Sequence, residues 1–124
     1  MHTYCLNVVC HKECEAGGIL IRAAEPVEGL RLILKNLNKH KYSDITKLLD
    51  GPGKLCKALR IDKTLNNEDM IEGEKIYFLE GEKVEKSDIV STPRINIPYA
   101  EECKNWPWRF IIKNSKFVSK VKVL

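Results

Sequence analysis

The sequence has neither a long apolar run nor a paired set of cysteines. Its unbroken hydrophobic stretches are only a handful of residues long, whereas a helix that crosses a bilayer needs about 20 residues. The five cysteines are odd in number and irregularly spaced, unlike the disulfide framework of a small secreted domain. The first residues also lack the basic start and the small-residue cleavage site of a secretory signal. We therefore expect a cytoplasmic protein in which most cysteines are reduced and partly buried, with no membrane partner.

Negative charge is missing from the last part of the chain. No acidic residue follows Glu102, and the basic and aromatic residues beyond it are Lys104, Trp106, Trp108, Arg109, Phe110, Lys113, Lys116, Lys120 and Lys122. Basic residues mixed with aromatics are typical of a nucleic-acid-binding surface. A solvated edge strand protected by lysines would have the same composition. The net charge of +4 is too small to decide between these two interpretations.

The composition that is present is that of one soluble domain. The 124 residues are 44% hydrophobic and 31% charged, which suits a folded chain with a core and not a disordered one. No repeat, linker or low-complexity segment divides the sequence. We therefore expect a single domain over residues 1–124.

The first part of the chain predicts a β-hairpin followed by a helix. Residues 5–10 and 18–24 are rich in Val, Ile and Leu, and the segment between them is charged and contains two glycines. Pro26 is expected to open the helix, because proline is favoured at a first helical position. The apolar stripe of that helix is Leu30, Ile33, Leu34 and Leu37.

The second part predicts short helices and further strands. Ser43 is expected to cap a helical piece over 43–50, which Gly-Pro-Gly at 51–53 ends, and a short helix with Leu55 and Leu59 on one side follows. The expected strands cover 75–84, 88–97 and 108–113, and residues 117–124 read as an edge strand or a tail. This order predicts an α/β-mixed (α+β) domain with a mostly antiparallel, curved sheet and a few helices.

Asn7 and Arg22 are the polar residues within the two apolar strands of the first hairpin. Strand side chains alternate between faces. Asn7 and Arg22 therefore share a face if the numbers of any two residues that lie opposite each other across the hairpin add to an odd number. Two explanations of a polar pair on an apolar sheet are open. The side chains could satisfy buried backbone groups, or they could line a pocket.

Gly51, Pro52 and Gly53 precede a short helix whose first turn carries Lys54. Backbone N–H groups and a lysine at such a position can contact a phosphate. The spacing of a Walker A loop is absent, and a plain junction between two helices explains the same residues.

Three possible ligands for a metal lie together at Cys10, His11 and Cys14. Zinc prefers these residue types, but the later pair of ligands that a zinc site normally has is missing. A small metal-binding protein is therefore an alternative that we do not favour, and we expect no metal and no cofactor. His2, His11 and His40 have no nearby nucleophile in a recognisable motif, and no paired carboxylates suggest acid–base chemistry.

Taken in order, several segments resemble the alkyladenine (3-methyladenine) DNA glycosylase family. They are "CLNVV", "ILIRAAEPVEG", "GPGKLCKALRIDKTLN", "TPRINI" and "PWRFIIKNSKFVS". The resemblance covers nearly the whole chain and corresponds to the C-terminal portion of the family's domain. It implies a partial version of that fold and excision of alkylated or deaminated purines from double-stranded DNA after base flipping.

The resemblance also implies roles for single residues. Asn7 matches the asparagine that crowds out the exocyclic amine of guanine, and Arg22 matches the arginine that holds the attacking water. Ile95 matches the residue whose main-chain carbonyl touches that water. Lys54 and Gly53 would lie near the DNA backbone. Asn96 stands where the family often has glycine.

The departures from the family pattern concern catalysis. The glutamate that activates the water and the tyrosine that wedges into DNA belong to family segments with no match in these 124 residues. Arg22 cannot replace the glutamate, because a guanidinium does not act as a base, and Glu25 belongs to the "AEP" turn. We therefore expect a truncated, nearly inactive form of a monomeric, bacterial-type repair enzyme that associates with the nucleoid through DNA. The alternative is a non-enzymatic nucleic-acid-binding module.

Overall fold

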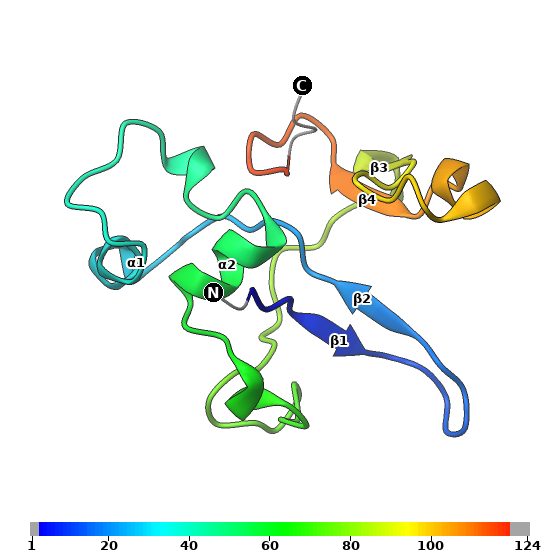
Figure 1. Cartoon of the computed structure of the whole chain (residues 1–124), viewed down its shortest axis with the longest axis horizontal. Helices are drawn as coiled ribbons and strands as arrows, with labels where there is room; N and C mark the ends of the chain where they lie inside the picture. Colours follow the sequence, from blue (N-terminus) through cyan, green and yellow to red (C-terminus); the bar gives the residue numbers. More distant parts are fainter. Residues whose placement is uncertain (1–2, 120–124) are drawn as a thin grey trace. The chain divides into compact units, whose positions relative to one another are not determined.

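The computed structural model describes residues 3–119, which form two compact units. The first unit contains residues 3–80 and 117–119, and the second contains residues 81–116. Helices and antiparallel strands occur together, which confirms the α+β class (Figure 1). The strands form two separate two-stranded sheets and not one curved sheet. A single domain over residues 1–124 stays a prediction.

The first unit begins with the predicted hairpin. Strand β1 (Asn7–Val9) pairs antiparallel with β2 (Gly18–Leu20). Asn7 lies opposite Leu20, and the Ile21 amide donates to the Leu6 carbonyl at 3.0 Å, which continues the pairing beyond the strands. The strands are therefore shorter than the predicted ranges 5–10 and 18–24.

Helix α1 (Leu30–Asn36) begins later than predicted. The prediction that Pro26 opens it is wrong. Gly29 has a φ of 75°, a left-handed conformation that does not occur inside an α-helix. The helix can therefore begin only after Gly29, and Pro26 lies in the irregular segment before it.

Capping of the next segment is also different from the prediction. Residues 43–50 form only a 3₁₀ turn, η1 (Ile45–Lys47), and its cap is Asp44 and not Ser43. The Asp44 carboxylate accepts from the Thr46 amide at 3.0 Å and from the Thr46 hydroxyl at 2.6 Å. Asp44 provides the oxygen that the first turn needs, so a serine cap is not required.

Helix α2 (Pro52–Ala58) follows the glycine-proline-glycine break as predicted, with Gly51 at the N-cap and Pro52 in the first turn. Leu55 is buried, whereas Leu59 is the C-cap residue and is exposed. Of the two leucines predicted on one side of this helix, only Leu55 lies within it, because the helix ends at Ala58.

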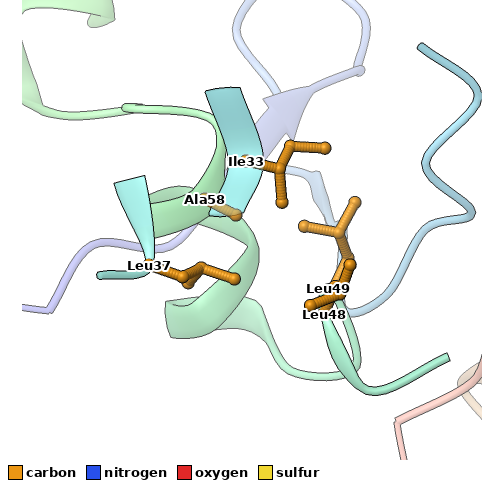
Figure 2. Packing of buried hydrophobic residues seen from close by; sticks show 5 residues of the cluster. All are labelled: Ile33, Leu37, Leu48, Leu49 and Ala58. Atoms are coloured by element: carbon orange, nitrogen blue, oxygen red, sulfur yellow. The ribbon is translucent and has the colours of Figure 1, made fainter. Parts of the chain in front are cut away.

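The core of the first unit lies between the two helices. Figure 2 shows its five buried side chains, which come from α1, from α2 and from the segment that precedes α2: Ile33, Leu37, Leu48, Leu49 and Ala58. The Asn36 side-chain amide donates to the Ala58 carbonyl at 2.8 Å and links the two helices. Leu6 and Ile21 of the hairpin pack against a second cluster on the other part of α2, made of Leu55, Cys56 and Ile61. The core thus fixes one face of the hairpin against α2.

The predicted strand over 75–84 does not form. The Glu68 carboxylate accepts from the backbone amides of Glu74 and Lys75, and the Asp69 carboxylate accepts from those of Ile71 and Glu72. Of these amides only that of Lys75 belongs to the predicted strand, and within the strand the Phe78 amide donates to the Met70 carbonyl at 2.7 Å. Groups of the preceding loop therefore accept from amides that a strand would donate to a neighbouring strand. A 3₁₀ turn, η2 (Lys63–Leu65), precedes this loop.

The second unit contains the other hairpin. Strand β3 (Ile89–Thr92) pairs antiparallel with β4 (Arg109–Ile112), so the predicted strands at 88–97 and 108–113 are confirmed but shorter. The 3₁₀ turns η3 (Lys86–Asp88) and η4 (Glu101–Asn105) flank the hairpin segments. Of the predicted edge strand or tail over 117–124, residues 117–119 are not a strand and residues 120–124 lie outside the described residues.

No helix within residues 3–119 has the length and apolar character that crossing a membrane requires.

Candidate functional site

The first hairpin has two different faces. Asn7 lies opposite Leu20, so the numbers of paired residues in this hairpin add to an odd number. Leu20 and Arg22 are two residues apart and Asn7 is the cross-strand partner of Leu20, so the pattern places Asn7 and Arg22 on one face. Val8, which is only 9% exposed, points to the other face. The polar pair therefore lies on the face opposite to Val8, and Asn7 is exposed there.

Arg22 is anchored by a residue far along the chain. Its Nε donates to the Ser119 Oγ at 3.3 Å, and Ser119 is only 5% exposed. The guanidinium of this half-buried arginine is thereby held in one orientation. Ser119 ends the segment "PWRFIIKNSKFVS", but no pattern within the sequence singled it out, because its partner lies 97 positions away.

Lys54 and Gly53 have local partners. The Lys54 Nζ forms an ion pair with the Asp50 carboxylate at 2.5 Å and donates to the Lys47 carbonyl at 2.8 Å. A Cβ on Gly53 would collide with the methyl group of Thr3. Both residues thus have structural reasons to be present, and their contact with a DNA backbone stays a prediction.

Ile95 belongs to the second unit and follows β3. Asn96 beside it has a φ of 59°. Glycine adopts this left-handed conformation freely and asparagine tolerates it better than most residues. This backbone requirement explains why asparagine can stand where the resembling family often has glycine.

Two arginines hold the segment around Ile95. The guanidinium carbon of Arg94 lies 5.4 Å from the ring centroid of Trp108, a cation–π contact. Arg109 Nη1 donates to the Thr92 Oγ1 at 3.2 Å, across the β3–β4 pair. The Arg94 Nε is buried and has no hydrogen-bond partner in the described part of the chain. These contacts fix residues on either side of Ile95.

Two aromatic residues of the predicted basic–aromatic segment lie together in the second unit, but the basic residue that contacts them is Arg94, which precedes that segment. The rings of Trp106 and Trp108 are 4.8 Å apart at an interplanar angle of 61°, an edge-to-face pair. Both indoles are exposed, as is Phe110 on β4. Arg94, Trp106 and Trp108 form an aromatic–basic cluster, in which the two indoles are exposed and Arg94 is half-buried.

The five cysteines are free, Cys56 is buried and Cys103 is half-buried, whereas the other three are exposed, so the prediction that most are partly buried is wrong. Burial raises the pKa of the Cys56 thiol, the neighbouring Cys5 raises it further, and the Leu6 backbone amide lowers it. Cys10 and Cys14 are exposed in the loop of the first hairpin. In residues 3–119 no group of three His, Cys, Asp or Glu side chains is arranged to hold a metal ion.

Comparison with known proteins identifies the family. The model of the methylpurine-DNA glycosylase family matches residues 1–116. A relative from Desulfitobacterium hafniense (strain Y51) is 48% identical over 96% of this chain and 60% of its own length, and one from Clostridium acetobutylicum is 43% identical over the same shares. A third, from Natranaerobius thermophilus, is 40% identical over 94% of this chain and 58% of its own length. All three bear the name "Putative 3-methyladenine DNA glycosylase".

The chain spans about 60% of the length of the D. hafniense and C. acetobutylicum relatives. The match to the family model runs through both hairpins and both helices, in agreement with the resemblance of the quoted segments. The chain belongs to the methylpurine-DNA glycosylase family.

Proposed function

We propose that this chain acts in base-excision repair, as part of a DNA glycosylase that removes alkylated or deaminated purines from double-stranded DNA. The observation that carries the proposal is the exposed face of the β1–β2 hairpin. Asn7 and Arg22 share this face by register, while the opposite face packs against the core of the first unit. A rigid backing with polar groups on its open side is what a base-binding wall requires.

Asn7 is proposed to select among purines. Asn7 is the first residue of β1, and the burial of its neighbour Val8 fixes the position of this strand. An asparagine side chain carried on this strand can exclude the exocyclic amine of guanine by steric conflict, while purines without that group fit. Selection by exclusion is appropriate here, because a glycosylase must reject normal bases that greatly outnumber damaged ones.

Arg22 and the main-chain carbonyl of Ile95 are proposed to contact the attacking water. Arg22 can donate hydrogen bonds but cannot take a proton, so it can orient the water without activating it. Its bond to the buried Ser119 restricts its rotamers, which favours such a positioning role.

No residue in 1–124 is assigned the role of the general base. A positioned base typically contributes a factor of about 10²–10⁴ to the rate. The chain by itself is therefore proposed to form a pocket wall and a DNA-contacting surface, including Lys54 and Gly53, with excision close to background. It is further proposed to be a monomer in the bacterial cytoplasm, associated with the nucleoid through DNA.

A single-turnover assay tests this proposal. A duplex with one hypoxanthine is incubated with this chain and, as a positive control, with a full-length family member that carries the glutamate. We expect product only with the control. Excision by this chain at the control's rate would contradict the assignment of the missing base.

A non-enzymatic nucleic-acid-binding module is the second candidate, favoured by the aromatic–basic cluster of Arg94, Trp106 and Trp108. Such a module would bind undamaged and damaged duplex equally, with an affinity that falls steeply as salt increases. Equal binding of both duplexes would favour the module, and preference for the hypoxanthine duplex would favour the glycosylase pocket.

A further inference from the structure

The positive charge of the first unit is concentrated around helix α1. Residues 3–80 and 117–119, which make up this unit, include 12 basic and 12 acidic side chains, so the unit as a whole is neutral. The segment 29–43 contains four of the basic residues and none of the acidic ones. This segment comprises α1 and the loop that follows it, and the remainder of the unit therefore has a net negative charge.

Most of these basic side chains line one concavity that is open to solvent. It has a volume of about 460 Å³ and is lined by Arg31, Leu34, Lys35, Asn38, Lys39 and His40. We call it the α1 concavity. No carboxylate is among its lining residues. Its apolar member, Leu34, packs against the core cluster of the first unit, so the cations lie on a fixed surface.

The backbone holds the far end of the α1 concavity against the helix. Asn38 has a φ of 57°, and its amide donates to the Lys35 carbonyl at 3.0 Å. The Lys39 amide donates to the Leu34 carbonyl at 2.9 Å. A left-handed residue followed by such a bond is a common helix ending. These amides satisfy the last carbonyls of α1, so the lysine side chains are not needed as donors to them.

Local structure does not account for the charges in the α1 concavity. Arg31 lies in the first turn of α1, where the helix dipole favours an acidic residue. Arg31 and Lys35 are four positions apart, a spacing at which like charges destabilise a helix. Within residues 3–119 the side chains of Arg31, Lys35 and Lys39 form no ion pair and no hydrogen bond. Lys54 of the same unit, in contrast, is paired with Asp50. The three cations therefore remain available to an anion.

We propose that the α1 concavity binds the phosphate backbone of double-stranded DNA, whether or not the DNA is damaged. Arg31 and Lys35 are about 6 Å apart along the helix axis, at 1.5 Å per residue, and Lys39 continues the row. A row of cations suits consecutive phosphates of one strand better than a single phosphate. Arginine can bind a phosphate through two N–H groups, and lysine binds it as a point charge.

This inference rests on the proposed function only for the choice of DNA as the polyanion. The α1 concavity contains neither the residues assigned to the base pocket nor Lys54 and Gly53. Its contribution to affinity should therefore be the same for damaged and undamaged duplexes. Preference for the hypoxanthine duplex, which tests the base pocket, is a separate measurement. Loss of that preference would contradict the pocket and leave the α1 concavity standing.

The test compares two triple variants that lose the same charge. The site variant replaces three cations of the concavity, Arg31→Gln, Lys35→Gln and Lys39→Gln. The control variant replaces three exposed lysines of the same unit outside it, Lys12→Gln, Lys63→Gln and Lys75→Gln. Fluorescence anisotropy measures binding of a short undamaged duplex over a series of salt concentrations. Each lost phosphate contact lowers the slope of log K against log salt by about 0.9, so we expect a decrease of about 2–3 for the site variant. The control variant should keep the wild-type slope.

Equal slopes for the two variants, or no binding of the undamaged duplex by the wild type at low salt, would overturn the proposal. Inorganic tripolyphosphate that binds the wild type but does not compete with the duplex would also overturn it, because the ligand would then be a free polyphosphate. Circular dichroism shows whether the variants are folded. An NMR titration of the wild type with the undamaged duplex does not depend on them and should shift the Leu34 methyl and Asn38 side-chain amide resonances. If these resonances stay in place while the duplex binds, the concavity is not the contact.

Discussion

The two hairpins of this chain have the same topology but are stabilised in different ways. The β1–β2 hairpin packs Leu6 and Ile21 against a buried cluster of the first unit. On β4 of the second hairpin, Phe110 and Ile112 are 65% and 52% exposed, and that hairpin is held by side-chain contacts of Arg94 and Arg109. Among residues 3–119 the buried hydrophobic residues all lie between Val8 and Ile61. The comparison shows that burial fixes the proposed base-pocket face, whereas pairwise contacts fix the segment around Ile95.

The largest expected effect is the loss of core packing in the first unit. Leu55 is 1% exposed, so Leu55→Ala should lower the free energy of unfolding by about 2–5 kcal/mol. Leu55 belongs to α2, against whose cluster the first hairpin packs. The comparison change in the second hairpin, Phe110→Ala, should cost about 0.5 kcal/mol or less because its ring is exposed. Urea unfolding followed by circular dichroism measures both values. Equal losses would show that the two hairpins are stabilised alike.

A smaller effect is expected from the aromatic contacts of the second unit. Trp108→Leu removes both the ring under Arg94 and the edge-to-face partner of Trp106. This change should lower the free energy of unfolding of the hairpin by about 0.5–1.5 kcal/mol. Amide exchange at Lys113, which donates to the Asp88 carbonyl at 2.7 Å, reports opening of this hairpin. Phe110→Leu is the control and should leave the exchange rate unchanged. If both variants exchange at the same rate, the arginine–tryptophan contact does not stabilise the hairpin.

The smallest expected effect is a loss of stability of the first unit at acidic pH. The Thr64 hydroxyl and then the Thr64 amide donate to Asp62 and lower the pKa of its carboxyl below 3.8. The pKa of Asp62 is thus lower in the folded state than in the unfolded state. Its contribution to stability is present above pH 3.8 and is lost as pH falls through the lowered pKa.

Thr64→Ala removes the hydroxyl and should reduce the decrease in the urea midpoint between pH 6 and pH 3 by a small amount. Asp69, whose pKa the Ile71 and Glu72 amides lower, is unaffected by this change and should keep its own part of the acid dependence. An unchanged decrease in Thr64→Ala would contradict the assigned cause.

Alternation and helix breakers made parts of the site predictable from sequence. Asn7 and Arg22 could be assigned to one face because the rule requires only an odd register. The position of α2 followed from Gly51 and Pro52. The helix-breaker signal is local, whereas the shared face of Asn7 and Arg22 was predicted only on the condition of an odd register, which the pairing of Asn7 with Leu20 supplies.

The incorrect predictions arose where a competing local interaction or a distant contact decided the structure. Gly29 delayed α1, and Asp44 capped the turn that Ser43 was expected to cap. The Glu68 carboxylate and the Met70 carbonyl accept hydrogen bonds from the Lys75 and Phe78 amides of a predicted strand. The Arg22–Ser119 bond could not be predicted from sequence, because a single serine has no pattern that identifies a partner 97 positions away.

The central claim is that the Asn7 and Arg22 face contacts the damaged nucleotide. The most direct measurement is an NMR titration of the isotope-labelled chain with a hypoxanthine duplex and with the matched undamaged duplex. We expect the Asn7 side-chain amide and the Arg22 Nε–H resonances to shift more with the hypoxanthine duplex, while the Val8 amide on the opposite face changes little. Shifts confined to the indole N–H groups of Trp106 and Trp108, equal for both duplexes, would contradict the claim and assign binding to the second unit alone.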